Sequence, residues 1–186
     1  MLHKNTLAQP VISERYFSEF ACMIFGTFLM FCASQITIPL EPVPITLQTF
    51  GVLLISLIFE RKTAIKSMAL YLSLGAIGAP VFASLSGGVA CLMGPTGGYL
   101  FGFLVCVMVV TTIRKHLKNT NLFTLLFSAL LGTVVIMGFG VAWLSMFIGF
   151  KSAINAGLLP FIVPGLAKAA LLAMLVRFLR LDKINS

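Results

Sequence analysis

Long runs of apolar residues with almost no charge constrain this chain more than any other feature of its sequence. The first run extends from residue 17 to 36 and contains one charge, Glu19, near its start. About 20 consecutive apolar residues are enough for a helix to cross the hydrocarbon core of a bilayer. Since 59% of the 186 residues are hydrophobic and 10% are charged, too little polar material remains to cover a soluble globule. We therefore predict an integral membrane protein.

Six apolar segments predict a single all-α transmembrane domain over residues 1–186. The second segment is short for a full crossing, so we expect part of it to be buried against protein or to be preceded by a loop that dips into the membrane. The fifth is long enough to be tilted or bent near Gly132, Gly138 and Gly140. The six predicted spans cover approximately residues 17–36, 46–59, 63–78, 96–113, 121–150 and 160–179.

The basic residues predict the orientation of these spans. Thirteen Lys and Arg residues against five Asp and Glu residues give a formal net charge of +8. The bases flank apolar runs, so membrane topology explains them and we expect no nucleic-acid partner. By the positive-inside rule, both termini are cytoplasmic and the loops 37–45, 79–95 and 151–159 face outside, with Lys151 in the last of them. This arrangement predicts a multi-pass protein of the cytoplasmic membrane. The bases on its cytoplasmic side are Lys4, Arg15, Arg61, Lys62, Lys66, Arg114, Lys115, Lys118, Arg177, Arg180 and Lys183.

The predicted outer loops are rich in glycine and proline. Three prolines between Pro39 and Pro44 favour a stiff, extended loop. The stretch Gly94-Pro95-Thr96-Gly97-Gly98-Tyr99 lies where the second outer loop meets the fourth span. Proline suits the first turn of a helix, and Thr96 is a possible N-cap. We expect Gly97 and Gly98 to let the backbone approach a bound solute closely.

Lys168 lies inside the sixth span, eight residues after Pro160. At 1.5 Å per residue, this places it about 12 Å below the outer end of the helix. An ammonium group at that depth costs a few kcal/mol unless it is paired or hydrated, which makes it a candidate for a binding site. The alternative is a lysine that snorkels or acts as a counter-charge in packing. The N-termini of spans two, four and six start on the same side, and with Lys168 they would suit an anionic or carbonyl-bearing solute if they converge.

Signatures of catalysis and of metal binding are missing from the sequence. There is no GxxxxGK[ST] phosphate-binding loop and no HExxH motif, and Ser86-Gly87-Gly88 has no nearby histidine or acid to act as a base. The four cysteines form no CxxC motif and are interpreted as packing residues. We therefore predict no enzyme activity, no metal site and no cofactor. A small membrane enzyme that acts on lipid is the least favoured alternative, and a purely structural subunit is disfavoured by Lys168.

Several long motifs resemble one family of membrane proteins. They are Pro39 to Gln48 (PLEPVPITLQ), Gly78 to Ala83 (GAPVFA), Gly87-Gly88, and Gly94 to Phe103 (GPTGGYLFGF). In order and spacing they look like the BioY family of biotin transporters, over about residues 20 to 175. That family supplies the substrate-binding S component of energy-coupling-factor (ECF) vitamin transporters.

This resemblance implies a six-helix protein that captures biotin from outside, with the first and third outer loops closing the site. It also implies a transmembrane coupling subunit and two ATPase subunits as partners, besides biotin and membrane lipid. The coupling subunit would contact the small-residue face of the first span, where Ser18, Cys22 and Gly26 follow one another at intervals of four. The family's usual alanine pattern is not cleanly kept there, and ordinary packing within the chain is the alternative.

One departure concerns the last helix, where the family carries an acid three residues before its lysine and this chain has Gly165. Lys168 is kept, and the resemblance gives it the carbonyl or the carboxylate of biotin. Asn155, Gln48, Thr96 or loop carbonyls are the candidates to accept the ureido N–H groups. An S component for another vitamin, or for a biotin-like acid such as lipoate, is the alternative function. The full set of predicted substrate-binding residues is Lys168, Thr96, Gly97, Gly98, Tyr99, Phe82, Gln48, Thr46 and Asn155.

Overall fold

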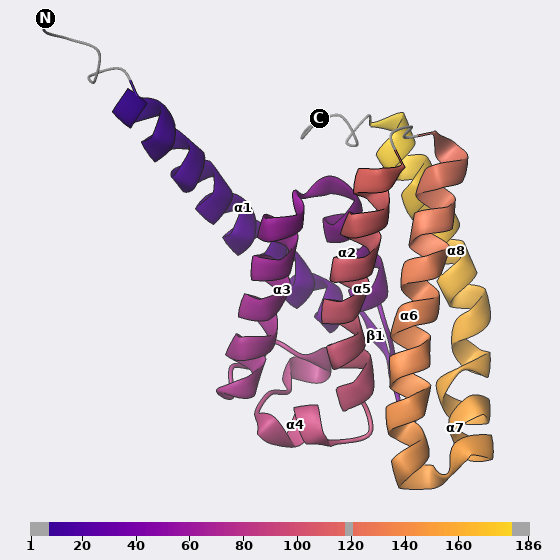
Figure 1. The fold of residues 1–186 in the computed structure, drawn as a ribbon. Coiled ribbons are helices and arrows are strands. Elements are labelled where there is room, and N and C mark those ends of the chain that lie inside the picture. Colours follow the sequence, from indigo (N-terminus) through magenta and orange to yellow (C-terminus); the bar gives the residue numbers. More distant parts are fainter. Residues whose placement is uncertain (1–7, 118–120, 180–186) are drawn as a thin grey trace, which may run out of the picture.

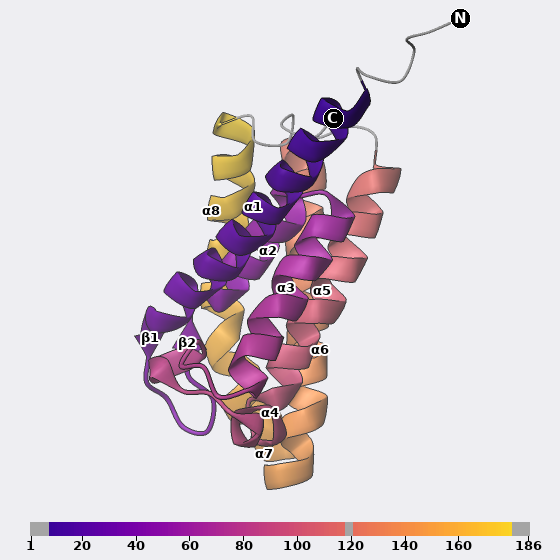
Figure 2. The ribbon, with the colours of Figure 1, turned by 90° about the vertical axis from the view of Figure 1, so that its left-hand side faces the viewer.

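The chain folds into a bundle of helices with loops and short elements concentrated at one end (Figures 1 and 2). The computed structural model describes residues 8–117 and 121–179, with side chains from residue 17 onward. The long helices are α1 (Ala8–Gln35), α5 (Gly97–His116), α6 (Leu122–Ile148) and α8 (Leu159–Phe178). The shorter elements are β1 (Thr37–Ile38), β2 (Ile45–Thr46), α2 (Gln48–Ile58), α3 (Arg61–Ala76), the 3-10 turn η1 (Ala83–Leu85), α4 (Val89–Met93) and α7 (Phe150–Gly157).

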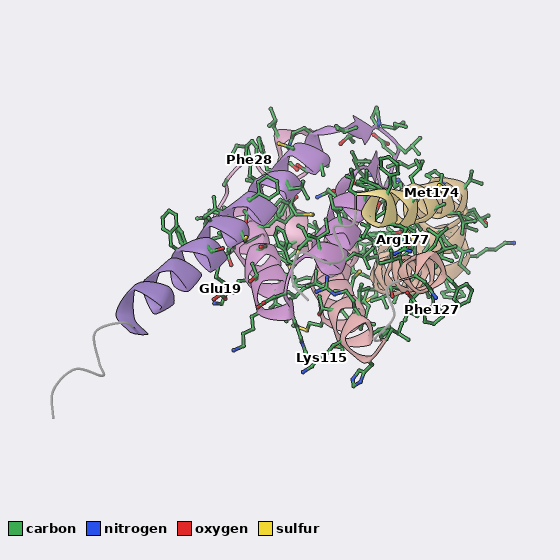
Figure 3. The ribbon with its side chains drawn as sticks, turned by 90° about the horizontal axis from the view of Figure 1, so that it is seen from above. Glu19, Phe28, Lys115, Phe127, Met174 and Arg177 are labelled. Carbon is green, nitrogen blue, oxygen red and sulfur yellow. The ribbon has the colours of Figure 1, made fainter. Side chains whose placement is uncertain are left out.

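Four helices in the described part of the chain are long and apolar enough to cross a membrane. They are residues Phe17–Gln35 of α1, together with α5, α6 and α8. Their outer surfaces stay apolar, as Phe28, Phe127 and Met174 at the periphery illustrate (Figure 3). The predicted spans 17–36, 96–113, 121–150 and 160–179 therefore coincide with these helices. A surface of this kind suits a hydrocarbon solvent.

The other two predicted spans form shorter helices. At 1.5 Å per residue, the 11 residues of α2 rise about 16 Å and the 16 residues of α3 about 24 Å. Both lengths are below the hydrocarbon thickness of about 30 Å. α2 packs against α1, α5, α6 and α8, and its residues Val52, Leu53 and Leu57 are fully buried. The expectation that the second segment is buried against protein is thus confirmed.

Two predicted loops contain regular structure. The first loop is a small antiparallel hairpin in which Thr37 pairs with Thr46 and Ile38 with Ile45, so the chain is not purely α-helical. The segment 151–159, predicted as a loop, is mostly the helix α7. At the loop-rich end, defined here as the end that carries β1, β2, α4 and α7, these elements lie together (Figures 1 and 2). We use this end as the reference for the site.

The opposite end of the bundle carries most of the predicted cytoplasmic bases. Lys66 forms a salt bridge with Glu19 at 2.7 Å, which joins α3 to α1. Arg114, in the last turn of α5, donates to the carbonyl oxygens of Leu57 and of Phe59, the latter at 2.7 Å. A cation at a helix C-terminus satisfies carbonyls that lack partners within the helix. Lys4, Lys118, Arg180 and Lys183 lie outside the described residues, and the side chain of Arg15 lies outside the described side chains.

Replacement of Arg114 by alanine should lower the free energy of unfolding by about 1–3 kcal/mol, because the carbonyls at the end of α2 lose a charged donor. The measurement is the unfolding midpoint of the purified protein in detergent. The neighbouring Lys115 is exposed, so Lys115→Ala serves as the matched control. Equal midpoints for the two variants would show that Arg114 does not cap α2.

Candidate ligand-binding site

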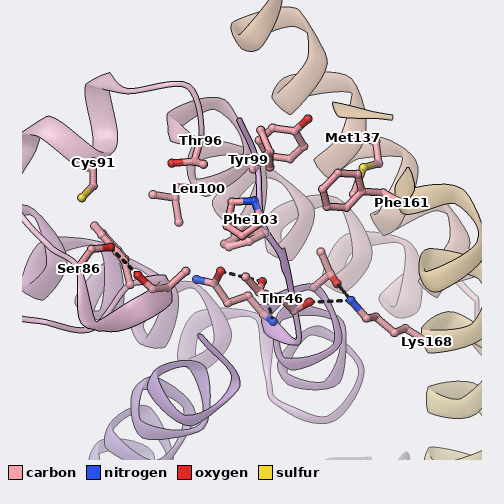
Figure 4. A pocket seen from close by; sticks show the side chains of 16 residues that line it. Thr46, Ser86, Cys91, Thr96, Tyr99, Leu100, Phe103, Met137, Phe161 and Lys168 are labelled. Carbon is pink, nitrogen blue, oxygen red and sulfur yellow. Dashed lines mark hydrogen bonds between the residues drawn. The ribbon is translucent and has the colours of Figure 1, made fainter. Parts of the chain in front are cut away.

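A cavity opens among the elements of the loop-rich end (Figure 4). It contains about 620 Å³ of space not filled by protein atoms, part of it open to solvent. Its lining combines a few polar groups with apolar and aromatic side chains, from Val43, Pro44, Thr46, Gln48, Thr49, Phe82, Ala83, Ser86, Cys91, Thr96, Tyr99, Leu100, Phe103, Met137, Phe161 and Lys168. The predicted residues Lys168, Thr96, Tyr99, Phe82, Gln48 and Thr46 are thus brought together.

Lys168 reaches the cavity from α8 (Figure 4). Its Nζ donates to the carbonyl oxygen of Thr46 at 2.6 Å and to the hydroxyl of Thr49 at 3.2 Å. In the part of the chain that the structure describes, no carboxylate forms a salt bridge with this ammonium group. An ammonium has three N–H donors, so one remains for a ligand. Lys168 therefore does not snorkel away from the bundle.

Gln48, in the first turn of α2, is nearly buried, with 5% of its surface exposed. Its Nε2 donates to the hydroxyl of Tyr71 at 2.7 Å, and its Oε1 accepts from the hydroxyl of Thr46 at 2.9 Å. Tyr71 in turn donates to the carbonyl oxygen of Val81 at 2.9 Å. This chain of bonds fixes the amide in one orientation. An amide has two N–H donors and two lone pairs on its oxygen, so Gln48 retains both a donor and an acceptor for a ligand.

Aromatic rings form the apolar part of the lining. Tyr99 donates its hydroxyl hydrogen to the carbonyl oxygen of Gly157 at 2.7 Å and stacks on Phe161 with 6.1 Å between ring centroids. A Cβ atom at Gly140 would lie 2.2 Å from the Tyr99 ring, so the absence of a side chain there makes room for it. The hydroxyl of Tyr99 is thus already hydrogen-bonded, and Tyr99 lines the cavity with its ring.

The segment between α3 and α4 is tied to the end of α1. Ser34 donates to the carbonyl oxygen of Val81 at 2.8 Å, and Gln35 Nε2 donates to that of Phe82 at 3.2 Å. Gln35 Oε1 also accepts from the backbone N–H of Leu85 at 3.1 Å. These bonds hold Phe82 in the wall of the cavity, where its ring packs edge-on against Tyr71 at 5.5 Å.

Gly97 and Gly98 do not line the cavity, and the atoms closest to them belong to other parts of the protein. A Cβ atom at Gly97 would lie 1.9 Å from the carbonyl oxygen of Leu92. A Cβ atom at Gly98 would lie 2.2 Å from Cβ of Trp143 and 2.6 Å from the carbonyl oxygen of Phe139. The close approach that these glycines permit is therefore to α4 and to α6, within the protein.

Thr96 does line the cavity, directly before α5. Thr96 occupies the N-cap position of α5, as expected, but its side chain makes no capping hydrogen bond with any described residue. The stretch is held instead by Trp143, whose Nε1 donates to the carbonyl oxygen of Gly94 at 3.0 Å. The hydroxyl of Thr96 makes no hydrogen bond with another described residue and stays available to a ligand in the cavity.

Asn155 and Gly165 lie outside the cavity lining. Asn155 is exposed on α7, so its predicted contact with substrate is not supported by the geometry. Gly165 is buried, and a Cβ atom there would lie 3.2 Å from Cγ2 of Thr133 on α6. The position at which the resemblance places an acid is therefore used here to pack α8 against α6. Within the described lining, the polar groups are Lys168, an amide, hydroxyls and a thiol.

The predicted partner-binding stripe of α1 is not one continuous surface. Gly26 is buried, and a Cβ atom there would lie 2.7 Å from the Ser67 hydroxyl of α3. Gly26 therefore serves packing within the chain, which was the alternative interpretation. Ser18 and Cys22 are exposed, and they share a face of α1 with the exposed aromatic residue Phe25.

Several lining residues were missed by the sequence interpretation, notably Thr49, Phe161 and Met137. Each lies in an apolar run, where side chains that face lipid, core or ligand look alike. A usable signal existed for Phe161, because it lies one residue after Pro160 in the first turn of the last span. Tyr71, which positions Gln48 from behind the lining, carried no signal of this kind.

Comparison with known proteins identifies similar chains. The sequence model of the BioY family matches residues 5–183. A protein of Pyrococcus horikoshii named probable biotin transporter BioY is 41% identical over 137 residues, which cover 74% of this chain and 80% of that one. The biotin transporter BioY of Thermotoga maritima is 38% identical over 160 residues, or 86% of this chain and 92% of the relative.

A solved structure is similar over nearly the whole length. It is described as the crystal structure of the S-component for biotin from an ECF-type ABC transporter. The two chains superpose with a TM-score of 0.82 at 28% identity, over 96% of this chain and 95% of the other. The arrangement of helices around the cavity is therefore shared with that protein.

Proposed function

This chain belongs to the BioY family, and we infer from this membership that it binds biotin and takes it up across the cytoplasmic membrane as the substrate-specific component of an ECF-type transporter. Its relatives are named transporters and not enzymes, in agreement with the sequence prediction. The apolar helices of the described chain fit a multi-pass protein of that membrane.

The observation that carries this proposal is the pairing of one cation with an aromatic wall in a single cavity. Biotin has a fused ring system with an apolar face, a ureido group with two N–H donors and a carbonyl oxygen, and an aliphatic tail that ends in a carboxylate. The free N–H of Lys168 meets an oxygen atom of the ligand, either the ureido carbonyl or the carboxylate. Tyr99, Phe161 and Phe82 offer the apolar surface for the rings and the tail.

The ureido N–H groups need acceptors on the protein. Gln48 Oε1 has a lone pair left after its bond to Thr46, and its orientation is fixed by Tyr71. The hydroxyls of Thr96 and Ser86 also line the cavity. No carboxylate is present in the described lining. We propose that these oxygen atoms accept the ureido N–H groups instead.

We further propose that the single domain 1–186 crosses the membrane six times, with α2 and α3 as the two short crossings. The start of α1, the end of α5 and the end of α8 lie at the same end of the bundle (Figure 1). The described bases Arg61, Lys62, Arg114 and Lys115 occur at this end, which supports cytoplasmic termini. The loop-rich end, with the cavity, would then face outside.

The proposed partners are a transmembrane coupling subunit and two ATPase subunits. The sequence contains no phosphate-binding loop for ATP, so energy would have to come from another chain. The exposed face of α1 around Ser18, Cys22 and Phe25 is free of charge and suits a helix of the coupling subunit. Gly26 is not part of that face.

The experiment that tests the function is binding of labelled biotin to the purified protein in lipid nanodiscs, with a panel of competitors. Unlabelled biotin should displace the label, and lipoate and unrelated vitamins should not. Lipoate lacks the ureido ring, so it cannot use the acceptors around Gln48. Displacement by lipoate at the same concentration as biotin would support the alternative of a less selective carrier. Absence of any biotin binding would refute the proposal.

A further inference from the structure

A second, apolar groove lies on the outside of the bundle between α6, α7 and α8. It contains about 1300 Å³ of unfilled space and opens to the surface. Among its lining residues, Thr133 carries a hydroxyl, and this already donates to the carbonyl oxygen of Ala129 at 2.9 Å. The side chains that line the groove therefore offer no unused hydrogen-bond donor, and its chemistry selects a hydrocarbon.

The position and length of the groove match one leaflet of a bilayer. Its lining residues on α6 run from Leu130 to Ala142, a rise of about 18 Å at 1.5 Å per residue. Half of the hydrocarbon core measures about 15 Å. Both α6 and α8 are helices that are long and apolar enough to cross the membrane. At this depth the surrounding solvent is acyl chain, so an acyl chain is the occupant that fits.

The short helix α7 closes the groove at the loop-rich end and is amphipathic. Phe150 and Ile154, one turn apart, line the groove, whereas Lys151, Ser152 and Asn155 are exposed. At about 100° per residue, Lys151 lies about 60° around the helix from Ile154, beside the groove. An amphipathic helix with a base on its polar face is typical of the membrane interface, where phosphate groups lie.

We propose that this groove is a binding site for one phospholipid, with an acyl chain between α6 and α8 and the phosphate group at Lys151. The charge of the lipid phosphate is complementary to that of the ammonium group. The lipid site is also connected to the cavity. Met137 and Phe161 line both spaces, and each has 7% of its surface exposed.

The shared wall has a consequence that rests on the proposed function. An acyl chain in the groove packs against Met137 and Phe161 from the membrane side and holds them in the positions that shape the cavity. Loss of the lipid leaves these side chains unsupported and lets them move. Biotin affinity should therefore fall when the lipid is removed.

The test uses Gly138→Phe. A Cβ atom at Gly138 meets no described atom within 4 Å, so the ring enters the groove in place of the lipid. Val163→Phe is the matched control, since Val163 lies on α8, is 74% exposed and does not line the groove. Each delipidated protein is titrated with dioleoyl phosphatidylglycerol in detergent and examined by native mass spectrometry. Ala142→Leu, one turn along the groove, replaces Gly138→Phe if that variant does not fold.

Wild type and Val163→Phe should retain one lipid at collision energies that remove all others, and Gly138→Phe should lose it. Lys151→Glu should also lose it, because the phosphate is then repelled. Equal lipid retention by Gly138→Phe and Val163→Phe overturns the proposal, and equal retention by Lys151→Glu overturns the headgroup assignment. A protein that retains the lipid but binds no biotin refutes the proposed function alone. Wild type that binds biotin but retains no lipid refutes the lipid site alone.

Discussion

Replacement of Lys168 by alanine is expected to weaken biotin binding by about 10- to 100-fold, the range that corresponds to the loss of one charge-assisted hydrogen bond of about 1.5–3 kcal/mol. The ammonium group is held by Thr46 and Thr49 with one N–H left over. Its loss removes the cation of the cavity, together with the two hydrogen bonds that join α8 to Thr46 and to Thr49 of α2. The measurement is isothermal titration calorimetry of the purified protein with biotin.

The control for Lys168→Ala is Lys62→Ala, which removes an exposed base far from the cavity lining. It should leave the dissociation constant unchanged. Unchanged binding by Lys168→Ala would mean that the ammonium group only braces the hairpin against α8. A variant that no longer elutes as a monodisperse protein would show that Lys168 is needed for folding, so gel filtration accompanies each titration.

Wild type and Lys168→Ala together identify the oxygen atom of biotin that Lys168 contacts. If this is the carboxylate, biotin amide should bind wild type more weakly than biotin, and Lys168→Ala should bind the two ligands equally. If it is the ureido carbonyl, Lys168→Ala should weaken both ligands by the same factor. A double-mutant cycle of this kind isolates one contact, because protein and ligand each change at one group.

Replacement of Gly98 by valine should destabilise the fold by more than about 3 kcal/mol, the upper end of the usual cost of overpacking. The added atoms collide with Cβ of Trp143 and with the carbonyl oxygen of Phe139, which belong to the neighbouring helix α6. Backbone atoms cannot swing aside as the end of a flexible side chain can. The helices α5 and α6 must therefore separate. The measurements are the yield of monodisperse protein and the midpoint of thermal unfolding.

Gly138→Val is the matched control for Gly98→Val, because it makes the same change in α6 where a Cβ atom meets open space. Its unfolding midpoint should stay close to that of wild type. If Gly98→Val unfolds like wild type but no longer binds biotin, the prediction that a ligand approaches this backbone would be supported.

The long helices were predictable because length and apolar composition decide whether a segment can cross a bilayer. α7 was not, because Phe150 to Gly157 mixes polar, small and apolar residues as loops do. It is helical because Phe150 and Ile154 pack along the end of the groove. The hairpin around Glu41 was expected as an extended loop, and its pairing depends on bonds between residues that the sequence pattern does not relate.

The candidate site was predictable where a residue differs in polarity from its neighbours in the sequence. Lys168 is a charge within an apolar run, and its place in the cavity follows from that. Gly98 shows the limit of this reasoning, because a glycine that allows a close approach does not reveal which group approaches. Trp143, its actual neighbour, is 45 positions away in the sequence, and that distance hides the contact. Phe161 was missed because aromatic residues are common throughout the chain.

Protection of Cys91 by biotin tests most directly whether this cavity is the binding site. Cys91 lines the cavity and is partly exposed, whereas Cys106 is buried. In a variant with Cys22→Ser and Cys32→Ser, the cysteines left in the described chain are Cys91 and Cys106, and of these two Cys91 is accessible to N-ethylmaleimide. Its labelling rate, followed by intact-protein mass spectrometry, should fall as biotin occupancy measured by calorimetry rises. An unchanged labelling rate at saturating biotin would contradict the assignment of this cavity.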